Sequence, residues 1–183
     1  MELSDFTEKT LFSETVFEGT LLRVFRDTVR LPDGKTSGRE YIRHIGAVCA
    51  VPLTDDGRVI VERQYRYPIG TETLELPAGK KNSREEDPET AVRRELREET
   101  GISAGKLSYL GPFYPAAAYS DEVIFLYLAE ELTFGEDQLD EDEFLSVNAV
   151  PLEELVGEIL AGRVPDAKTQ AAVLRVYLMK KRP

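Results

Sequence analysis

Residues 76–102 read LPAGKKNSREEDPETAVRRELREETGI and combine a glycine turn, a helix start, a helix end and an unusual group of carboxylates. Asp87 followed by Pro88 is typical of a helix N-cap with proline at the first helical position. Gly101 is typical of the residue just past a helix end. We therefore predict a helix over residues 87–100.

Three glutamates share one face of this predicted helix. Glu95, Glu98 and Glu99 stand at i, i+3 and i+4, positions that the helical period of 3.6 residues brings together. Val92 and Leu96, the large apolar residues of the helix interior, flank Glu99 on a helical wheel. The carboxylates are therefore expected beside the buried stripe.

Two interpretations of these carboxylates compete. A solvated helix with Glu–Arg pairs is the commoner one, and Arg94 with Glu98 at i,i+4 fits it. However, carboxylates clustered at the edge of a core need a counter-charge to stay ionised. A hard divalent cation such as Mg²⁺ or Mn²⁺ prefers oxygen ligands and supplies that charge. The position of the cluster favours a metal site.

Nine residues of the stretch resemble the signature of the Nudix hydrolases: Gly79, Glu86, Arg94, Glu95, Leu96, Glu98, Glu99, Gly101 and Ile102. The resemblance implies that Glu95, Glu98 and Glu99 are ligands of Mg²⁺ or Mn²⁺, with more than one ion per site. Glu98 is also implied in catalysis, and Arg94 is implied to hold a carboxylate in position.

The resemblance also assigns roles to the loop before the helix. It implies that the backbone at Ala78 and Gly79 approaches metal or substrate, and that Glu86 assists in binding metal. The family pattern has five residues between its glycine and its first glutamate, whereas six separate Gly79 from Glu86. Glu85 restores that spacing but makes the interval to Arg94 one residue too long, so both glutamates stay open.

Composition limits the classes of protein. A chain of 183 residues with 42% hydrophobic content can form one domain, or one domain with a small extension. The formal charge of −11 disfavours general nucleic-acid binding, which relies on basic patches. The sequence has no apolar run long enough to cross a bilayer and no N-terminal targeting signal, so we expect a cytoplasmic protein without membrane association.

The single cysteine and the single histidine argue against nucleophilic catalysis. Cys49 lies in the apolar run GAVCAVPL and is expected to be a buried structural thiol. The chain has no second histidine or second cysteine to complete a soft-metal site with His44, and we interpret it as a strand residue. A Ser-His-Asp or Cys-His catalyst is correspondingly disfavoured.

The first part of the chain predicts a hairpin, with strands at about 20–31 and 39–44 joined by a turn at 32–34. The whole layout resembles the ADP-ribose pyrophosphatase branch of the Nudix family. That resemblance implies a mixed α/β fold, an α/β/α sandwich with a small N-terminal antiparallel sheet. Residues 1–45 would then be an N-terminal extension that forms a homodimer, and residues 46–183 the catalytic domain; the alternative is a hairpin packed only on its own domain.

Strands are also predicted at 46–53 and 58–65, and the second ends in RQYRYP. RQYR resembles the family segment whose arginine reaches the diphosphate of the substrate, which makes Arg66 the first candidate for substrate binding, followed by Arg43 and Arg63. A guanidinium suits this role because its planar fork donates two hydrogen bonds to phosphate oxygens. An ordinary solvated arginine at a strand end is the alternative.

Further strands are predicted at 106–113 and 122–128, and helices at 151–161 and 166–181. The segment 135–145, GEDQLDEDEFL, is densely acidic. In the resembled branch a glutamate before the aromatic residue is a proposed catalytic base, which points to Glu143, with Glu141 as the alternative. A loop carboxylate could deprotonate or orient the attacking water; solubility alone is the competing explanation.

The resemblance implies metal-dependent hydrolysis of ADP-ribose to AMP and ribose 5-phosphate. The alternatives are pyrophosphatases of another nucleotide sugar or a dinucleotide, such as GDP-mannose or a flavin or nicotinamide dinucleotide, and a domain that senses nucleotides without cleaving them. The connection YPAAAYSDE at 114–122 replaces a proline-glycine pair of the branch by alanines. No tryptophan is present, so stacking on the base would fall to residues such as Phe25, Tyr41, Tyr65 or Tyr67.

Overall fold

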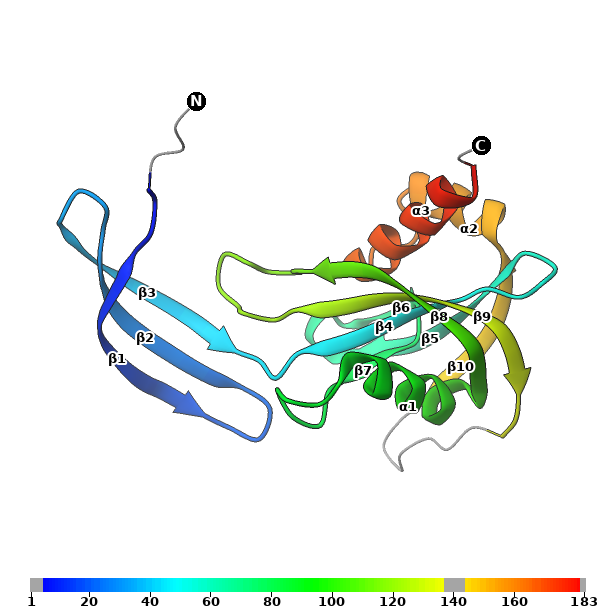
Figure 1. Ribbon diagram of the computed structural model, residues 1–183, viewed down its shortest axis with the longest axis horizontal. Helices are drawn as coiled ribbons and strands as arrows, with labels where there is room; N and C mark the ends of the chain where they lie inside the picture. Colours follow the sequence, from blue (N-terminus) through cyan, green and yellow to red (C-terminus); the bar gives the residue numbers. More distant parts are fainter. Residues whose placement is uncertain (1–4, 137–143, 182–183) are drawn as a thin grey trace. The chain divides into compact units, whose positions relative to one another are not determined.

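The computed structural model describes residues 5–136 and 144–181 (Figure 1). The chain divides into two units. One contains the chain up to His44 together with Ala116–Glu122, and the other contains Ile45–Pro115 and the chain from Val123 onward. Helices together with strands in both parallel and antiparallel arrangement confirm the predicted mixed α/β class.

The N-terminal unit is an antiparallel sheet of three strands in the order β1-β2-β3. β1 spans Lys9–Glu18, β2 spans Arg23–Arg30 and β3 spans Thr36–Arg43. The predicted hairpin corresponds to β2 and β3. The sequence did not predict β1, because almost every residue of this strand is exposed and no alternation of apolar and polar residues marks it.

A distant segment of the chain completes this unit. Ser120 forms a parallel bridge with Ile42, and the backbone N–H of His44 donates to Asp121 Oδ1 at 2.6 Å. His44 directly follows β3 instead of lying within a strand, and its Nδ1 is 3.9 Å from Glu122. Its surroundings are those of a structural residue.

The second unit contains a mixed sheet in the order β7-β4-β9-β8. β7 is Ala78–Lys80, β4 is Ala47–Pro52, β9 is Ile124–Phe134 and β8 is Ile102–Phe113. β4 and β9 pair in parallel, whereas the pairs β4–β7 and β8–β9 are antiparallel. β4 is buried along its whole length, which explains its nearly continuous apolar sequence.

A smaller antiparallel sheet has the order β10-β5-β6. β5 spans Arg58–Arg66, β6 spans Thr71–Glu75 and β10 spans Leu145–Pro151. A single 3-10 turn, Tyr67–Ile69, joins β5 to β6. This turn places the end of β5 beside the start of β6, so that Arg66 pairs with Thr71 in the register.

The helices of the second unit cover the mixed sheet: α1, Pro88–Thr100; α2, Leu152–Leu160; and α3, Ala167–Lys181. Alternate residues of β4 enter two separate cores, because successive side chains of a strand point to opposite faces. Val48 and Ala50 pack in the core that includes α1, and Cys49 and Val51 pack in the core that includes α2 and α3. The result is the predicted α/β/α arrangement.

Cys49 is completely buried within the second of these cores, and burial raises the pKa of its thiol far above the ordinary range. A thiol with such a pKa stays protonated, as expected for a structural cysteine. Among the helices that the structure describes, none is both long and apolar enough to cross a membrane.

Candidate active site

The caps of α1 lie where the sequence predicts them. The Asp87 carboxylate accepts a hydrogen bond from the backbone N–H of Thr90 at 2.9 Å, and Gly101 ends the helix with a φ of 68°. Val92 and Leu96 are buried against the mixed sheet. These contacts fix the rotation of the helix, and with it the positions of the three glutamates.

Arg94 gathers carboxylates from the helix and from the loop before it. Its Nη1 donates to Glu95 Oε1 at 2.8 Å and to Glu98 Oε2 at 3.0 Å. Its Nη2 lies 3.6 Å from Glu86 Oε2 and donates to the backbone carbonyl of Lys80 at 3.0 Å. Partial burial lowers the pKa of Arg94, but the adjoining charges of Glu95 and Glu98 outweigh it and raise the pKa above its ordinary value.

The other members of the cluster hold the helix to strand β7. The backbone N–H of Ala78 donates to Glu99 Oε2 at 2.9 Å, and Glu99 is buried. Gly79 lies directly against the carboxylate of Glu95: a Cβ at this position would come within 2.1 Å of Glu95 Oε2. The sequence predicted a turn at Gly79, but the structure places it within strand β7, paired with Val48. Glycine is needed here for the approach of Glu95, because any side chain would displace that carboxylate.

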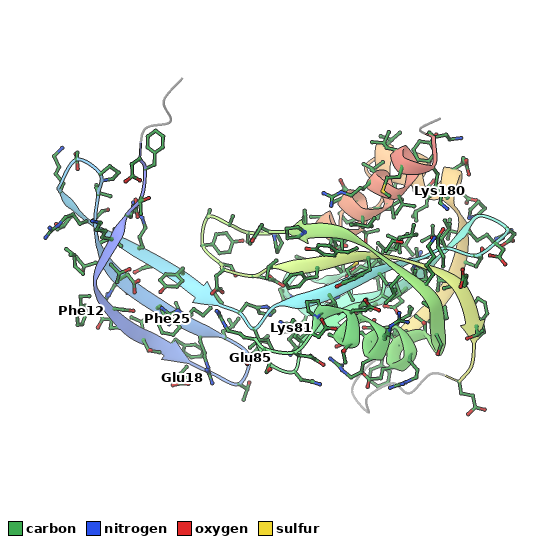
Figure 2. All side chains as sticks on the ribbon, in the orientation of Figure 1. Phe12, Glu18, Phe25, Lys81, Glu85 and Lys180 are labelled. Atoms are coloured by element: carbon green, nitrogen blue, oxygen red, sulfur yellow. The ribbon has the colours of Figure 1, made fainter. Side chains whose placement is uncertain are left out.

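The position of the loop distinguishes the two candidates for the first glutamate. Glu86 is partly buried, accepts a hydrogen bond from the backbone N–H of Asn82 and lies next to Arg94. Glu85, labelled in Figure 2 on the loop between β7 and α1, is exposed. The loop between Gly79 and Glu86 is one residue longer than in the family pattern, and its conformation still brings Glu86 into the cluster.

The chemistry of these donors fits a hard divalent cation. Glu86, Glu95 and Glu98 contribute three formal negative charges around one guanidinium, and carboxylate oxygens are the ligands such cations prefer. Within residues 5–136 and 144–181, no three His, Cys, Asp or Glu side chains are already arranged to hold a metal ion. In this structure Arg94 supplies the positive charge between the glutamates. The donor set for a cation is therefore present, with Arg94 as the group that orders it.

Arg66, at the end of β5, forms a bidentate ion pair. Its Nε donates to Glu75 Oε1 at 2.7 Å and its Nη2 donates to Glu75 Oε2 at 2.8 Å. Hydrogen bonding to Glu75 raises the pKa of Arg66. Burial alone would raise the pKa of Glu75, but the bonds from Arg66 and Lys168 more than compensate and lower it to about 2. Both side chains of this pair are therefore ionised at neutral pH.

The other two candidate arginines have different surroundings. Arg63 is exposed, with its Nη1 3.7 Å from Glu72, and it lies three residues from Arg66 on the same strand and hence on the opposite face. Arg43 belongs to the N-terminal unit, where its guanidinium lies 4.2 Å from the ring centre of Phe25 and donates to the hydroxyl of Tyr41 at 2.9 Å. Arg66 is the only one of the three that the structure holds in a bidentate pair with a buried carboxylate, within the described residues.

Glu143 and Glu141, the candidates for the catalytic base, lie outside the described residues. The sequence did not identify Glu75 or Lys168, which meet although they are 93 residues apart. Leu74 and Leu76 flank Glu75, and this alternation of apolar and charged residues is ordinary for a strand, so it did not mark Glu75.

Comparisons with known proteins agree with this geometry. A family model described as NUDIX domain matches residues 43–173, and a model described as nucleoside diphosphate sugar hydrolase N-terminal domain matches residues 8–42. The first therefore includes the whole carboxylate cluster and Arg66, and the second includes nearly all of the N-terminal sheet.

Individual proteins match over almost the whole chain. An ADP-ribose pyrophosphatase of Bacillus subtilis is 40% identical over 178 residues, 96% of each chain. A methanol dehydrogenase activator of Bacillus methanolicus is 38% identical over 177 residues, 96% of this chain and 95% of the relative. A solved structure described as an ADP compounds hydrolase superposes with a TM-score of 0.84 and 25% identity, with 95% of this chain and 94% of the other covered.

Proposed function

Because this chain belongs to the Nudix family, whose hydrolases generally use divalent metal ions, we propose that it hydrolyses the diphosphate bond of ADP-ribose to give AMP and ribose 5-phosphate. The observation that carries the proposal is the group of glutamates gathered by Arg94 on α1 and the preceding loop. Similarity to an ADP-ribose pyrophosphatase along nearly the entire chain supports the choice of substrate.

Glu95, Glu98 and Glu99 are the residues that would hold Mg²⁺ or Mn²⁺, with Glu86 and the backbone of Ala78 in support. Bound metal, more than one ion per site, would neutralise charge on the diphosphate and lower the pKa of the attacking water. Such charge reversal matters for a chain with a formal charge of −11 that receives an anionic substrate.

Arg94 would keep the glutamates in position, since its guanidinium already bonds two of them. Arg66 would orient the diphosphate: its bonds to Glu75 use Nε and Nη2 and leave the two Nη1 hydrogens for phosphate oxygens. Arg63 and Arg43 are secondary candidates for substrate binding, and Gly79 would allow close approach of the backbone. For the residue that orients or deprotonates water we propose Glu143, with Glu141 as the alternative, on the sequence resemblance alone.

The N-terminal sheet would form the interface of a homodimer. β1 is an edge strand and carries exposed apolar side chains on a small sheet, which is unusual for a surface in contact with water. These side chains include Phe12, which is 60% exposed (Figure 2), Val16 and Phe17. A second copy of this chain would cover them.

Sedimentation equilibrium tests the homodimer. We expect a mass of about twice the 20.6 kDa of one chain. The variant Phe12→Glu should shift the equilibrium toward one chain, because it places a charge in the proposed interface. Leu160→Glu, which changes another exposed apolar residue on α2, is the matched control and should not alter the mass. A wild-type mass of one chain at micromolar concentration would contradict the proposal.

Selection of the substrate can be measured by competition. Purified protein is incubated with Mg²⁺ and equal concentrations of ADP-ribose, GDP-mannose and a nicotinamide dinucleotide, and mass spectrometry follows the depletion of each. Relative depletion gives the ratio of kcat/KM values directly. We expect ADP-ribose to be consumed at least about 10 times faster than the others. Preferential depletion of another compound would still be consistent with hydrolysis of a diphosphate bond, but it would identify that compound as the substrate in place of ADP-ribose.

A further inference from the structure

The N-terminal end of α3 is joined to the end of β6 by polar side chains. Lys168, in the first turn of the helix, donates from its ammonium to Glu75 Oε2 and lies 3.1 Å from Asp166 Oδ1. The hydroxyl of Thr169 accepts a hydrogen bond from the backbone N–H of Leu76 at 2.9 Å. Two consecutive residues of the helix thus contact two consecutive residues of the chain leading to β7.

Glu75 is the centre of this arrangement. Its Oε1 accepts from Arg66 Nε and from the hydroxyl of Thr73, and its Oε2 accepts from Arg66 Nη2 and from Lys168. The residue is only 2% exposed, so its carboxylate depends on these donors in place of water. Four donors on two oxygens define one orientation of the carboxylate.

The orientation of Glu75 determines the orientation of Arg66. A bidentate pair holds the planar guanidinium in the plane of the carboxylate, so rotation of one group moves the other. Lys168 bonds the oxygen that Arg66 reaches with Nη2, on the side of the carboxylate toward α3. Without Lys168, Oε2 would keep only the bond from Arg66, and no donor from α3 would oppose rotation of the Glu75 carboxylate.

Helix stability does not account for a lysine at this position. A cation in the first turn is unfavourable, because the helix dipole places partial positive charge there. The side chain of Lys168 is also only 11% exposed, which adds a desolvation penalty. Asp166, which caps the helix by accepting from the backbone N–H of Thr169 at 2.9 Å, and Glu75 offset both effects. The burial and the ion pairs therefore indicate a role in fixing Glu75.

We propose that Lys168 is a positioning residue that acts through Glu75 to hold Arg66 in the orientation that binds the diphosphate. The proposal rests on the proposed function, in which Arg66 contacts the substrate. It assigns to α3, a helix that otherwise packs in the core, a part in substrate binding.

A double-mutant cycle tests the connection. Lys168→Met removes the ammonium and retains much of the apolar side chain, and we expect kcat/KM for ADP-ribose to fall about 10- to 100-fold, mainly through KM. In an Arg66→Ala background the same substitution should change kcat/KM less than about 2-fold, because the group it positions is absent. Lys168→Arg should restore part of the loss.

The matched control is Lys180→Met, at the other end of α3 (Figure 2), where Lys180 pairs with Glu130 at 2.8 Å. It removes one lysine from the same helix and should leave kcat/KM unchanged. Circular dichroism and thermal unfolding of each variant identify those that remain folded. Equal losses of kcat/KM from Lys168→Met in both the wild-type and Arg66→Ala backgrounds would show a purely structural role and overturn the proposal.

Nuclear magnetic resonance of the Arg66 Nε–H group provides a readout independent of turnover. In the wild type the bond to Glu75 should protect this proton from exchange with water; in Lys168→Met the exchange should become faster, and in Lys168→Arg slower again. Unchanged exchange would overturn the proposal. A wild type that hydrolyses no nucleoside diphosphate sugar, or an Arg66→Ala variant with wild-type KM, would instead contradict the proposed function.

Discussion

Replacement of Glu98 by glutamine is expected to lower kcat by at least about 100-fold, which corresponds to about 2.7 kcal/mol of lost transition-state stabilisation. Glutamine has nearly the same shape but lacks the negative charge that a divalent cation requires. Glu98 is about one-third exposed and bonds Arg94, so the effect on the free energy of unfolding should stay below about 1 kcal/mol. Steady-state kinetics with Mg²⁺ and thermal unfolding measure the two quantities.

Glu89→Gln is a matched control for this substitution. Glu89 belongs to the same helix and also pairs with an arginine four residues away, Arg93, but on the exposed side. Its replacement should leave kcat within about 2-fold of the wild type, because surface pairs contribute little. Wild-type turnover in Glu98→Gln would remove Glu98 as an essential ligand.

Replacement of Gly79 by alanine is expected to lower kcat/KM by a comparable factor, about 100-fold, while the protein remains folded. The added methyl group would overlap the Glu95 carboxylate, because the new Cβ would come within 2.1 Å of it. Since that carboxylate ends a flexible side chain, it can move away at little cost in stability. Its displacement would remove a proposed metal ligand from its position.

Gly157→Ala on α2 provides the comparison, because, apart from its two chain neighbours and the backbone of its own helix, no atom lies within 4 Å of the corresponding methyl position. Alanine is favoured over glycine inside a helix by about 1 kcal/mol, so this control should be slightly more stable and equally active. Full activity of Gly79→Ala would show that Glu95 can leave its observed position without consequence, and would contradict its role as a metal ligand.

The parts of the fold with local signals could be predicted from the sequence. α1 has its cap at Asp87 and its end at Gly101, and both features depend on residues within one turn of the helix. β4 could be recognised because both of its faces are buried, which requires an apolar run. β1 lacked such a signal: it is an edge strand with exposed side chains, and its pairing with β2 contains two irregularities in register, between Thr10 and Phe12 and between Thr15 and Phe17.

In the candidate site, too, some contacts could be predicted from local sequence and others could not. Helical spacing brings Glu95 and Glu98 together around Arg94, and the structure places them there, whereas Glu86 joins them from the preceding loop. The pairing of Arg66 with Glu75 depends on strand register, and the contact of Lys168 with Glu75 depends on how α3 packs on the sheet. Neither contact has a counterpart in local sequence: Arg66 and Glu75 are 9 residues apart on paired strands, and Lys168 and Glu75 are 93 residues apart and meet only in the folded chain.

Metal-dependent hydrolysis of the diphosphate is tested by incubation of the purified protein with ADP-ribose in water enriched in ¹⁸O, with Mg²⁺ or with excess chelator. We expect mass spectrometry to detect AMP and ribose 5-phosphate in the sample with Mg²⁺ and not in the sample with chelator. One of the two products should contain one ¹⁸O atom. Intact ADP-ribose under both conditions, or equal turnover in the presence of chelator, would contradict metal-dependent hydrolysis of the diphosphate.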